Sequence, residues 1–230
     1  EAELDTLKNS EENKAATEKQ LKSLQTELVR AGTEISKKRK SAAAELEKKI
    51  EDVLKNLGMQ KTRFAVNVEK KETDGTKQKA GPYGFDDIEF LISPNLGEPL
   101  KPLAKIASGG ELSRVMLAIK TVLTRGDGAD TLIFDEIDTG IGGEVALSVA
   151  EHMKQLSHSK QILCVTHLAV IAAHAHNQIK IEKTAQAGKT FTNAGKIVGE
   201  KRIEEIARML SGDEASSVSM LHAKELLDKY

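Results

Sequence analysis

The chain has 230 residues, enough for one or two domains, and a formal net charge of −1 that gives no global attraction to nucleic acid. Its 39% hydrophobic residues can build one core, whereas 30% charged and 3% aromatic residues indicate that part of the chain is solvated helix. The single cysteine, Cys164, excludes an internal disulfide and fits a reducing cytoplasm. No apolar run reaches the roughly 20 residues of a membrane span. The start at Glu1, without a methionine, favours a fragment of a longer protein.

Residues 1–60 predict one long helix, because they contain no proline and are rich in Lys, Glu, Ala and Leu. Apolar residues three and four apart form a stripe with one register break. The stripe consists of Leu21, Leu24, Leu28, Ala31, Ile35 and Ala42, then Leu46, Ile50, Val53 and Leu57. It favours a coiled-coil arm, although an ordinary amphipathic surface helix has a similar pattern. The basic run from Lys37 to Lys40 could contact DNA phosphates or form a solvated face.

After residue 61 the hydrophobic period changes. Two alternating runs, at residues 64–68 and 88–92, predict a small antiparallel element with a tight turn at Asp74-Gly75. Beyond residue 102, helices and strands alternate, which predicts an α/β fold with a mainly parallel sheet and flanking helices. The expected helices are 109–124, 144–156, 169–175, 201–210 and 216–228. The expected strands are 131–135, 161–166 and 178–182.

The expected helix start at Ser108 could bind phosphate. Ser108 and Glu111 have the spacing of a capping box, which by itself only begins a helix. Gly109 and Gly110 argue for more, since each glycine costs up to roughly 1 kcal/mol against alanine inside a helix. Bare glycine lets an anion approach the first-turn N–H groups, where the helix dipole favours negative charge.

An acidic pair ends the expected strand 131–135. Neighbouring residues on a strand point to opposite sides, so Asp135 and Glu136 can do different work. Asp135 is placed to hold Mg²⁺, which takes one or two protein carboxylates. Glu136 is placed to orient or deprotonate an attacking water. The alternative is an acidic turn that only ends a strand.

Two further features belong to the same region. A glycine-rich loop over residues 137–143 carries Asp138 and could present it to a partner surface. His167 follows the expected strand 161–166, so it lies at the same sheet edge if the two strands are parallel neighbours. From there it could donate a hydrogen bond to a γ-phosphate, although a lone histidine at a strand end is more often structural. His174 and His176 lack the accompanying residues of a zinc site.

The loop that would wrap a triphosphate is missing. Its pattern, G-x-x-x-x-G-K-[ST], combines backbone N–H groups with a lysine that reaches the phosphates. The nearest match is Gly188-Lys189-Thr190, where Lys183 occupies the place of the first glycine.

The order of these motifs resembles the C-terminal lobe of an ABC-type P-loop ATPase head. The stretch that begins at Ser108 resembles the signature motif, and the acidic pair resembles Walker B. Asp138 resembles the D-loop residue, and His167 the switch histidine. Ala107 and Glu111 replace the leucine and glutamine of transporters, which points to the SMC-like branch. Within that branch, residues 62–230 are similar to the RecN family of bacterial DNA-repair ATPases, on the stretches 106–114, 138–143, 205–212 and 222–227.

The resemblance implies a coiled-coil arm at residues 1–60 and the head lobe at 61–230, with ATP and Mg²⁺ as cofactors. ATP would lie on an N-terminal P-loop lobe of the same protein, facing Asp135, Glu136 and His167. Ser108, Gly109 and Gly110, within the signature stretch that Glu111 completes, would contact the γ-phosphate of ATP on a second head. Two heads would thus form a homodimer around ATP, and hydrolysis would release a grip on DNA in the bacterial cytoplasm.

On this reading the isolated chain is expected to be inactive as an ATPase, because it lacks the P-loop. Three alternatives remain open: the head of another SMC-type chromosome-organising ATPase, a transporter ATPase subunit, and a non-catalytic coiled-coil scaffold.

Overall fold

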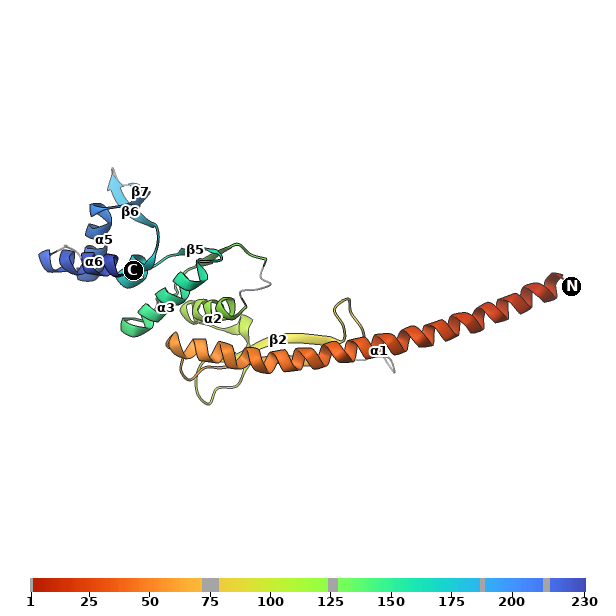
Figure 1. Ribbon diagram of the computed structural model, residues 1–230. Coiled ribbons are helices and arrows are strands. Elements are labelled where there is room, and N and C mark those ends of the chain that lie inside the picture. The colour runs from red at the N-terminus through yellow and green to blue at the C-terminus, as the bar shows by residue number, and fades with distance from the viewer. Residues whose placement is uncertain (1, 72–78, 124–127, 187–188, 213–215) are drawn as a thin grey trace. The chain divides into compact units, whose positions relative to one another are not determined.

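The computed structural model describes residues 2–71, 79–123, 128–186, 189–212 and 216–230 (Figure 1). They form two compact units, one of residues 1–48 and 65–91 and the other of residues 49–64 and 92–230. The turn expected at Asp74-Gly75 lies outside the described residues. Among the described residues, no helix combines the length and apolar character that crossing a membrane requires.

Helix α1 runs from Ala2 to Asn56 without a break, which confirms the long helix predicted from composition (Figure 1). The apolar stripe of its first half is exposed to solvent: Leu21, Leu24, Leu28 and Ile35 are all more than 40% exposed. Farther along, Ile50 and Leu54 are fully buried in the core of the second unit. The helix stops before Gly58, which adopts a left-handed φ of 78° that glycine tolerates best.

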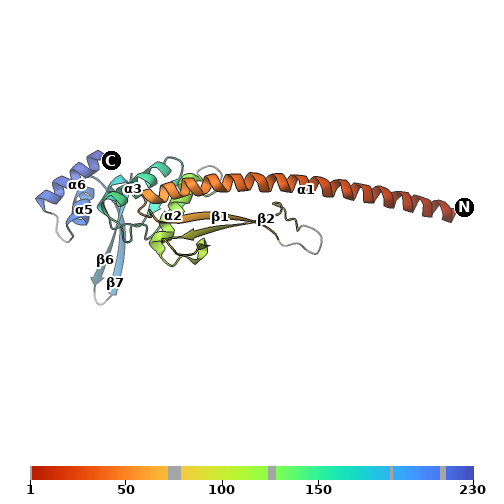
Figure 2. The same ribbon diagram turned by 90° about the horizontal axis from the view of Figure 1, so that it is seen from below.

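In the first unit, strands pack against α1. Strands β1 (Arg63–Lys70) and β2 (Asp86–Ser93), which lie largely in this unit, run along the helix (Figure 2). The sheet order is β1-β2-β3, where β3 is the short strand Lys101–Pro102. Both alternating runs of the sequence are therefore strands. The ring of Phe85 packs directly on Gly32 of α1, where a β-carbon would overlap the ring. Gly32 is thus a contact point on α1 for the residue that precedes β2.

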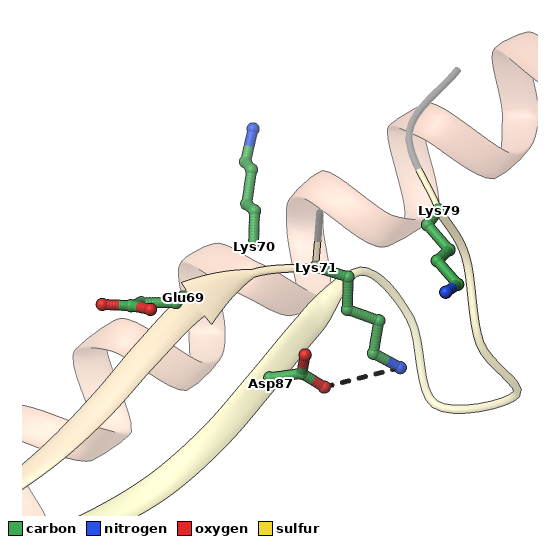
Figure 3. A pocket seen from close by; sticks show the side chains of 5 residues that line it. All are labelled: Glu69, Lys70, Lys71, Lys79 and Asp87. Atoms are coloured by element: carbon green, nitrogen blue, oxygen red, sulfur yellow. Dashed lines mark ion pairs between the residues drawn. The ribbon is translucent and has the colours of Figure 1, made fainter. Parts of the chain in front are cut away.

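A shallow depression lies where β1 ends and β2 begins (Figure 3). Its lining mixes three lysines with two acidic residues: Glu69, Lys70, Lys71, Lys79 and Asp87. The Nζ atom of Lys71 lies 3.8 Å from Oδ1 of Asp87. Since the charges largely balance and none of the candidate site residues lines it, this depression is not the candidate site.

The second unit contains the predicted strand–helix alternation. Short 3₁₀ turn η1 (Leu103–Lys105) leads to α2 (Gly109–Val122), followed by β4 (Thr131–Phe134), α3 (Gly143–Leu156), β5 (Gln161–Cys164) and α4 (Ala169–His174). Strands β4 and β5 pair in parallel, with Thr131 opposite Gln161 and Phe134 opposite Cys164. One face of this pair is buried through Leu132 and Phe134, whereas Ile133 on the other face is 70% exposed.

The next strand differs from the sequence prediction. β6 (Gln178–Gln186) was expected in the parallel sheet, but it pairs antiparallel with β7 (Lys189–Ile197). The prediction of a mainly parallel sheet is therefore wrong for the described residues, where β4 and β5 are the parallel pair. β7 was not predicted, because its residues, KTFTNAGKI, show little apolar alternation.

Two helices end the chain, α5 (Glu200–Ser211) and α6 (Ser217–Lys229), close to the predicted bounds. They pack with α4 around a small alanine-rich core that includes Ala172, Ile206 and Ala223. Small side chains let the helix backbones approach closely. This cluster supports the end of α4, which begins just after the candidate site.

Candidate functional site

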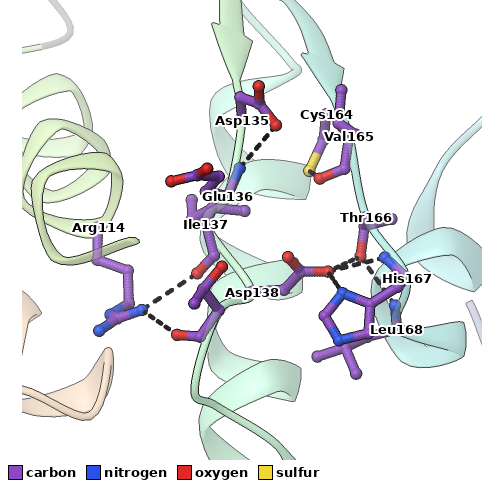
Figure 4. Close-up of polar contacts among 11 residues, drawn as sticks. Arg114, Asp135, Glu136, Ile137, Asp138, Cys164, Val165, Thr166, His167 and Leu168 are labelled. Atoms are coloured by element: carbon purple, nitrogen blue, oxygen red, sulfur yellow. Dashed lines mark hydrogen bonds and ion pairs between the residues drawn. The ribbon is translucent and has the colours of Figure 1, made fainter. Parts of the chain in front are cut away.

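The acidic pair and the histidine lie at one edge of the β4–β5 pair (Figure 4). Val165 N donates to the carbonyl of Phe134 at 3.0 Å, so the parallel register continues one residue beyond the strands. Asp135 and His167 therefore emerge from the carboxyl ends of neighbouring parallel strands, as the sequence analysis expected. In open α/β sheets this edge is where ligands bind.

The acidic pair has a strained backbone. Glu136 has φ = 56°. In the described part of the chain, every other residue with a positive φ is a glycine. A left-handed conformation costs an L-residue roughly 1–2 kcal/mol. A tight turn holds it, because Thr139 N donates to the carbonyl of Glu136 at 3.0 Å. Oδ1 of Asp135 accepts from the N–H of Glu136 at 2.9 Å, and both side chains remain exposed.

The start of α2 lies against this turn. Glu111 N donates to Oγ of Ser108 at 3.4 Å, a long capping bond, and Glu111 is half-buried. A β-carbon on Gly109 would overlap the carboxylate of Glu136. One on Gly110 would lie 3.0 Å from the carbonyl oxygen of Glu136. Gly110 thus has a packing role against backbone, whereas Gly109 meets the end of a flexible side chain. The structure brings the Ser108 motif and the acidic pair together.

Asp138 differs from its expectation. The loop was expected to present it to a partner surface, but the residue is only 3% exposed. Its Oδ2 accepts from Oγ1 of Thr166 at 2.6 Å and from the backbone N of His167 at 2.8 Å. The same oxygen lies 3.0 Å from Nδ1 of the His167 ring. The carboxylate turns inward because donors from the end of β5 satisfy it there.

Two residues of α2 hold the loop and were missed as functional candidates. Ser113 donates its hydroxyl to the carbonyl of Asp135 at 2.7 Å. Arg114 is buried, and its Nη1 donates to the carbonyls of Ile137 at 3.3 Å and Thr139 at 3.1 Å (Figure 4). Burial lowers the pKa of the Arg114 guanidinium from its ordinary value. The sequence signal that could have identified them is a pair of polar residues, Ser113 and Arg114, within the apolar pattern of this helix.

Cys164 lies at the same edge but is chemically quiet. Burial raises the pKa of its thiol to about 12, and the nearby charges of Asp138 and Asp135 act in the same direction. Since the thiolate is the reactive form of cysteine, the neutral thiol serves as a small packing residue.

The possible metal ligands at this edge suit Mg²⁺ better than they suit a metal ion whose ligands all come from the protein. Among the described residues there is no group of three or more His, Cys, Asp or Glu that could hold a metal ion. Mg²⁺ does not need one, because it keeps several waters and commonly takes one carboxylate together with substrate phosphates. The exposed carboxylate of Asp135 is compatible with that arrangement.

Comparison with known proteins shows that this chain is similar to DNA repair proteins named RecN. The DNA repair protein RecN of Treponema pallidum is 52% identical over 225 residues, which are 98% of this chain and 39% of that protein. RecN of Halalkalibacterium halodurans is 40% identical over 99% of this chain and 40% of its own length. The chain thus spans about two fifths of these relatives. An Smc head domain with a coiled coil and joint from Pyrococcus yayanosii aligns with a TM-score of 0.47 and 20% identity, over 81% of this chain and 29% of that one. No protein-family model matches.

Proposed function

Since this chain belongs to the RecN family of DNA repair proteins and corresponds to about the C-terminal two fifths of its members, we propose that it is the ATP-hydrolysing lobe of a DNA-repair ATPase in the bacterial cytoplasm. The observation that carries the proposal is the shared edge of β4 and β5. Asp135 and Glu136 end one strand, His167 follows the other, and the start of α2 contacts Glu136.

Each side chain has a role in this proposal. Asp135 would hold Mg²⁺, which supplies charge neutralisation to the phosphates of bound ATP. Glu136 orients or deprotonates the attacking water, and His167 donates a hydrogen bond to the γ-phosphate. The exposed positions of Glu136 and His167 at one edge favour these roles over a purely structural one.

The Ser108 motif would contact the γ-phosphate of ATP bound to a second head. In this structure the carboxylate of Glu136 lies where a β-carbon of Gly109 would be. A phosphate at the start of α2 would therefore require the Glu136 side chain to turn away, which its exposed position allows. The ATP-bound homodimer of heads is thus a state in which Glu136 has left α2.

The rest of the full-length protein would supply the missing P-loop. Parallel strands usually have both faces covered, yet Ile133, Leu163 and Val165 are 70%, 45% and 57% exposed. We assign this apolar face to the N-terminal lobe of the same protein. The exposed stripe of Leu21, Leu24 and Leu28 on α1 favours pairing with a second coiled-coil helix in the same way.

DNA would be held by the intact protein, since the chain has almost no net charge. In the proposed cycle, ATP binding joins two heads and hydrolysis separates them, so that the grip on DNA opens. A non-catalytic scaffold is the competing function, and it predicts that the acidic pair can be replaced without effect.

The test is Glu136→Gln in the full-length protein. We expect ATPase activity and DNA repair in cells to be lost, while ATP-bound dimers accumulate in size-exclusion chromatography. Glu151→Gln, an exposed position on α3, is the matched control and should behave as wild type. A variant at Glu136 that hydrolyses ATP and repairs DNA at the normal rate would refute the proposal. Measurable ATPase activity of the isolated chain would refute the assignment of the P-loop to the missing lobe.

A further inference from the structure

We propose that Asp138 is a positioning residue that holds the His167 ring through Nδ1 and so presents Nε2 to the nucleotide. This inference rests on the proposed function, because it assigns a partner within the chain to the γ-phosphate donor. It replaces the expectation that Asp138 faces another subunit. One buried carboxylate oxygen, Oδ2 of Asp138, makes the contacts that carry it.

Asp138 and His167 differ sharply in their exposure to solvent. Asp138 is 3% exposed, whereas the side chain of His167 is 73% exposed. The buried carboxylate of Asp138 therefore holds the exposed ring of His167 at the strand edge (Figure 4). Thr166 helps to fix this carboxylate by donating its hydroxyl to Oδ2 at 2.6 Å. The same hydroxyl oxygen accepts from Leu168 N at 3.1 Å, which ties the start of α4 to this cluster.

The backbone around Asp138 is held from the opposite side. Arg114 donates to the carbonyls of Ile137 and Thr139, the residues immediately before and after Asp138. Because Arg114 is itself buried, these two bonds hold the backbone on both sides of Asp138. Turning the side chain outward would break the bonds that Oδ2 accepts from Thr166 and from the backbone of His167. Hydrogen bonds from α2 and from the end of β5 therefore fix the backbone and the carboxylate of Asp138, respectively.

The position of the Asp138 carboxylate determines which ring nitrogen of His167 is free to face the nucleotide. A neutral imidazole has one N–H group, and a carboxylate at Nδ1 favours the tautomer that places the proton there. Nε2 then faces outward. A ring with both N–H groups donates through Nδ1–H to Asp138 and through Nε2–H to a phosphate oxygen. Without the carboxylate, either nitrogen could carry the single proton and the ring would lose its fixed orientation.

The decisive experiment is a double-mutant cycle in the full-length protein with Asp138→Asn and His167→Ala. Asparagine can place its oxygen where Oδ2 lies, so Thr166, the His167 backbone and the His167 ring all keep an acceptor and the fold should survive. The substitution removes the charge that favours a proton on Nδ1. We expect Asp138→Asn to lower kcat by about 10- to 100-fold, the size of effect seen when the partner that orients a metal-binding histidine is removed. The Kd for ATP should change less than threefold or so. In the His167→Ala background, Asp138→Asn should cause no further loss.

Effects that multiply in the double variant would overturn the inference, because Asp138 would then act independently of His167. An unchanged kcat in Asp138→Asn would overturn it as well. Asp130→Asn, an exposed position just before β4, is the matched control. Failure of the proposed function has a different signature, since Glu136→Gln would then retain ATPase activity whatever Asp138→Asn does.

A measurement on the wild-type side chain keeps the inference testable if Asp138→Asn fails to fold. The ¹⁵N spectrum of histidine-labelled full-length protein at pH 9 reports the tautomer of each ring, and the His167 signals are assigned by their absence in His167→Gln. We expect the proton on Nδ1. A proton on Nε2 would show that Asp138 does not hold the ring.

Discussion

Gly110 of α2 lies against the backbone of Glu136: a β-carbon at Gly110 would be 3.0 Å from the carbonyl oxygen of Glu136 and 3.1 Å from Cβ of Thr139. These separations are shorter than nearly all contacts that real β-carbons make. The start of α2 and the turn after the acidic pair are therefore packed as one piece. A change on either side should be felt on the other.

Gly110→Ala should disturb this contact. The extra methyl group has to displace backbone rather than a flexible side-chain end, and overpacking of this kind costs about 1–3 kcal/mol. We expect a lower midpoint of thermal unfolding and a lower ATPase rate in the full-length protein. Gly195→Ala in β7 is the control, because a β-carbon there meets nothing within 4 Å. Equal behaviour of the two variants would show that the packing at Gly110 is loose.

Ser108 and Ser216 separate helix capping from phosphate contact. Ser108 caps α2 with a long 3.4 Å bond, whereas Ser216 caps α6 at 3.1 Å within a full capping box. Ser216→Ala should therefore lower stability by about 1 kcal/mol and leave ATPase activity intact. Ser108→Ala should cost less stability yet abolish the ATP-dependent dimer. If Ser108→Ala changes stability alone, Ser108 is a helix cap and nothing more.

Asp86 of β2 accepts hydrogen bonds from Ser36 and Arg39 of α1, and the stability that these bonds contribute should be lost in acid. Burial by itself would raise the pKa of Asp86, but hydrogen bonds from Ser36 and Arg39 outweigh it and hold the pKa below its ordinary value. A carboxyl whose pKa is lowered by folding stabilises the protein above the pKa of the unfolded chain, and this contribution is lost as the pH falls through the folded value. The loss should therefore occur below about pH 4.

Asp86→Asn measures that contribution. We expect a loss of about 2–3 kcal/mol at neutral pH, below the range for a fully buried pair because Arg39 is partly exposed. The difference from wild type in urea unfolding should shrink below about pH 4. Asp87→Asn, whose side chain is 74% exposed, should change stability by less than about 0.5 kcal/mol. A constant difference across pH would mean that Asp86 contributes through packing rather than through its charge.

Cys164 should react slowly in the folded protein. With a thiol pKa of about 12, almost no thiolate is present at pH 8. Iodoacetamide labelling, followed by mass spectrometry, should therefore be much slower in the native protein than in urea. Rapid labelling of the native protein would show that the edge of β5 opens to solvent.

Much of this molecule could be predicted from local pattern. The lack of proline and the abundance of helix-forming residues predicted α1 to within a few residues of its observed end. The alternating runs predicted β1 and β2, and the strand–helix order predicted that Asp135 and His167 would share an edge. These features depend on neighbours in sequence, or on the rule that parallel strands align their carboxyl ends.

Other features could not be predicted, because they depend on residues that meet only in space. The partner of β6 is a polar strand with little periodicity, so the antiparallel hairpin had no clear sequence signal. The inward turn of Asp138 depends on donors about thirty residues away, at Thr166 and His167. The role of Arg114 depends on the loop that it faces across the fold.

The chemical groups of this protein, and the order in which strands and helices carry them, follow from the sequence, since periodicity, propensity and motif spacing are properties of short segments. Which of these groups touch depends on the tertiary fold. It placed the carboxylate of Glu136 against the start of α2 and buried Asp138 beneath His167. These outcomes follow because burial and hydrogen-bond satisfaction are set by residues distant in sequence, and those contacts orient each side chain.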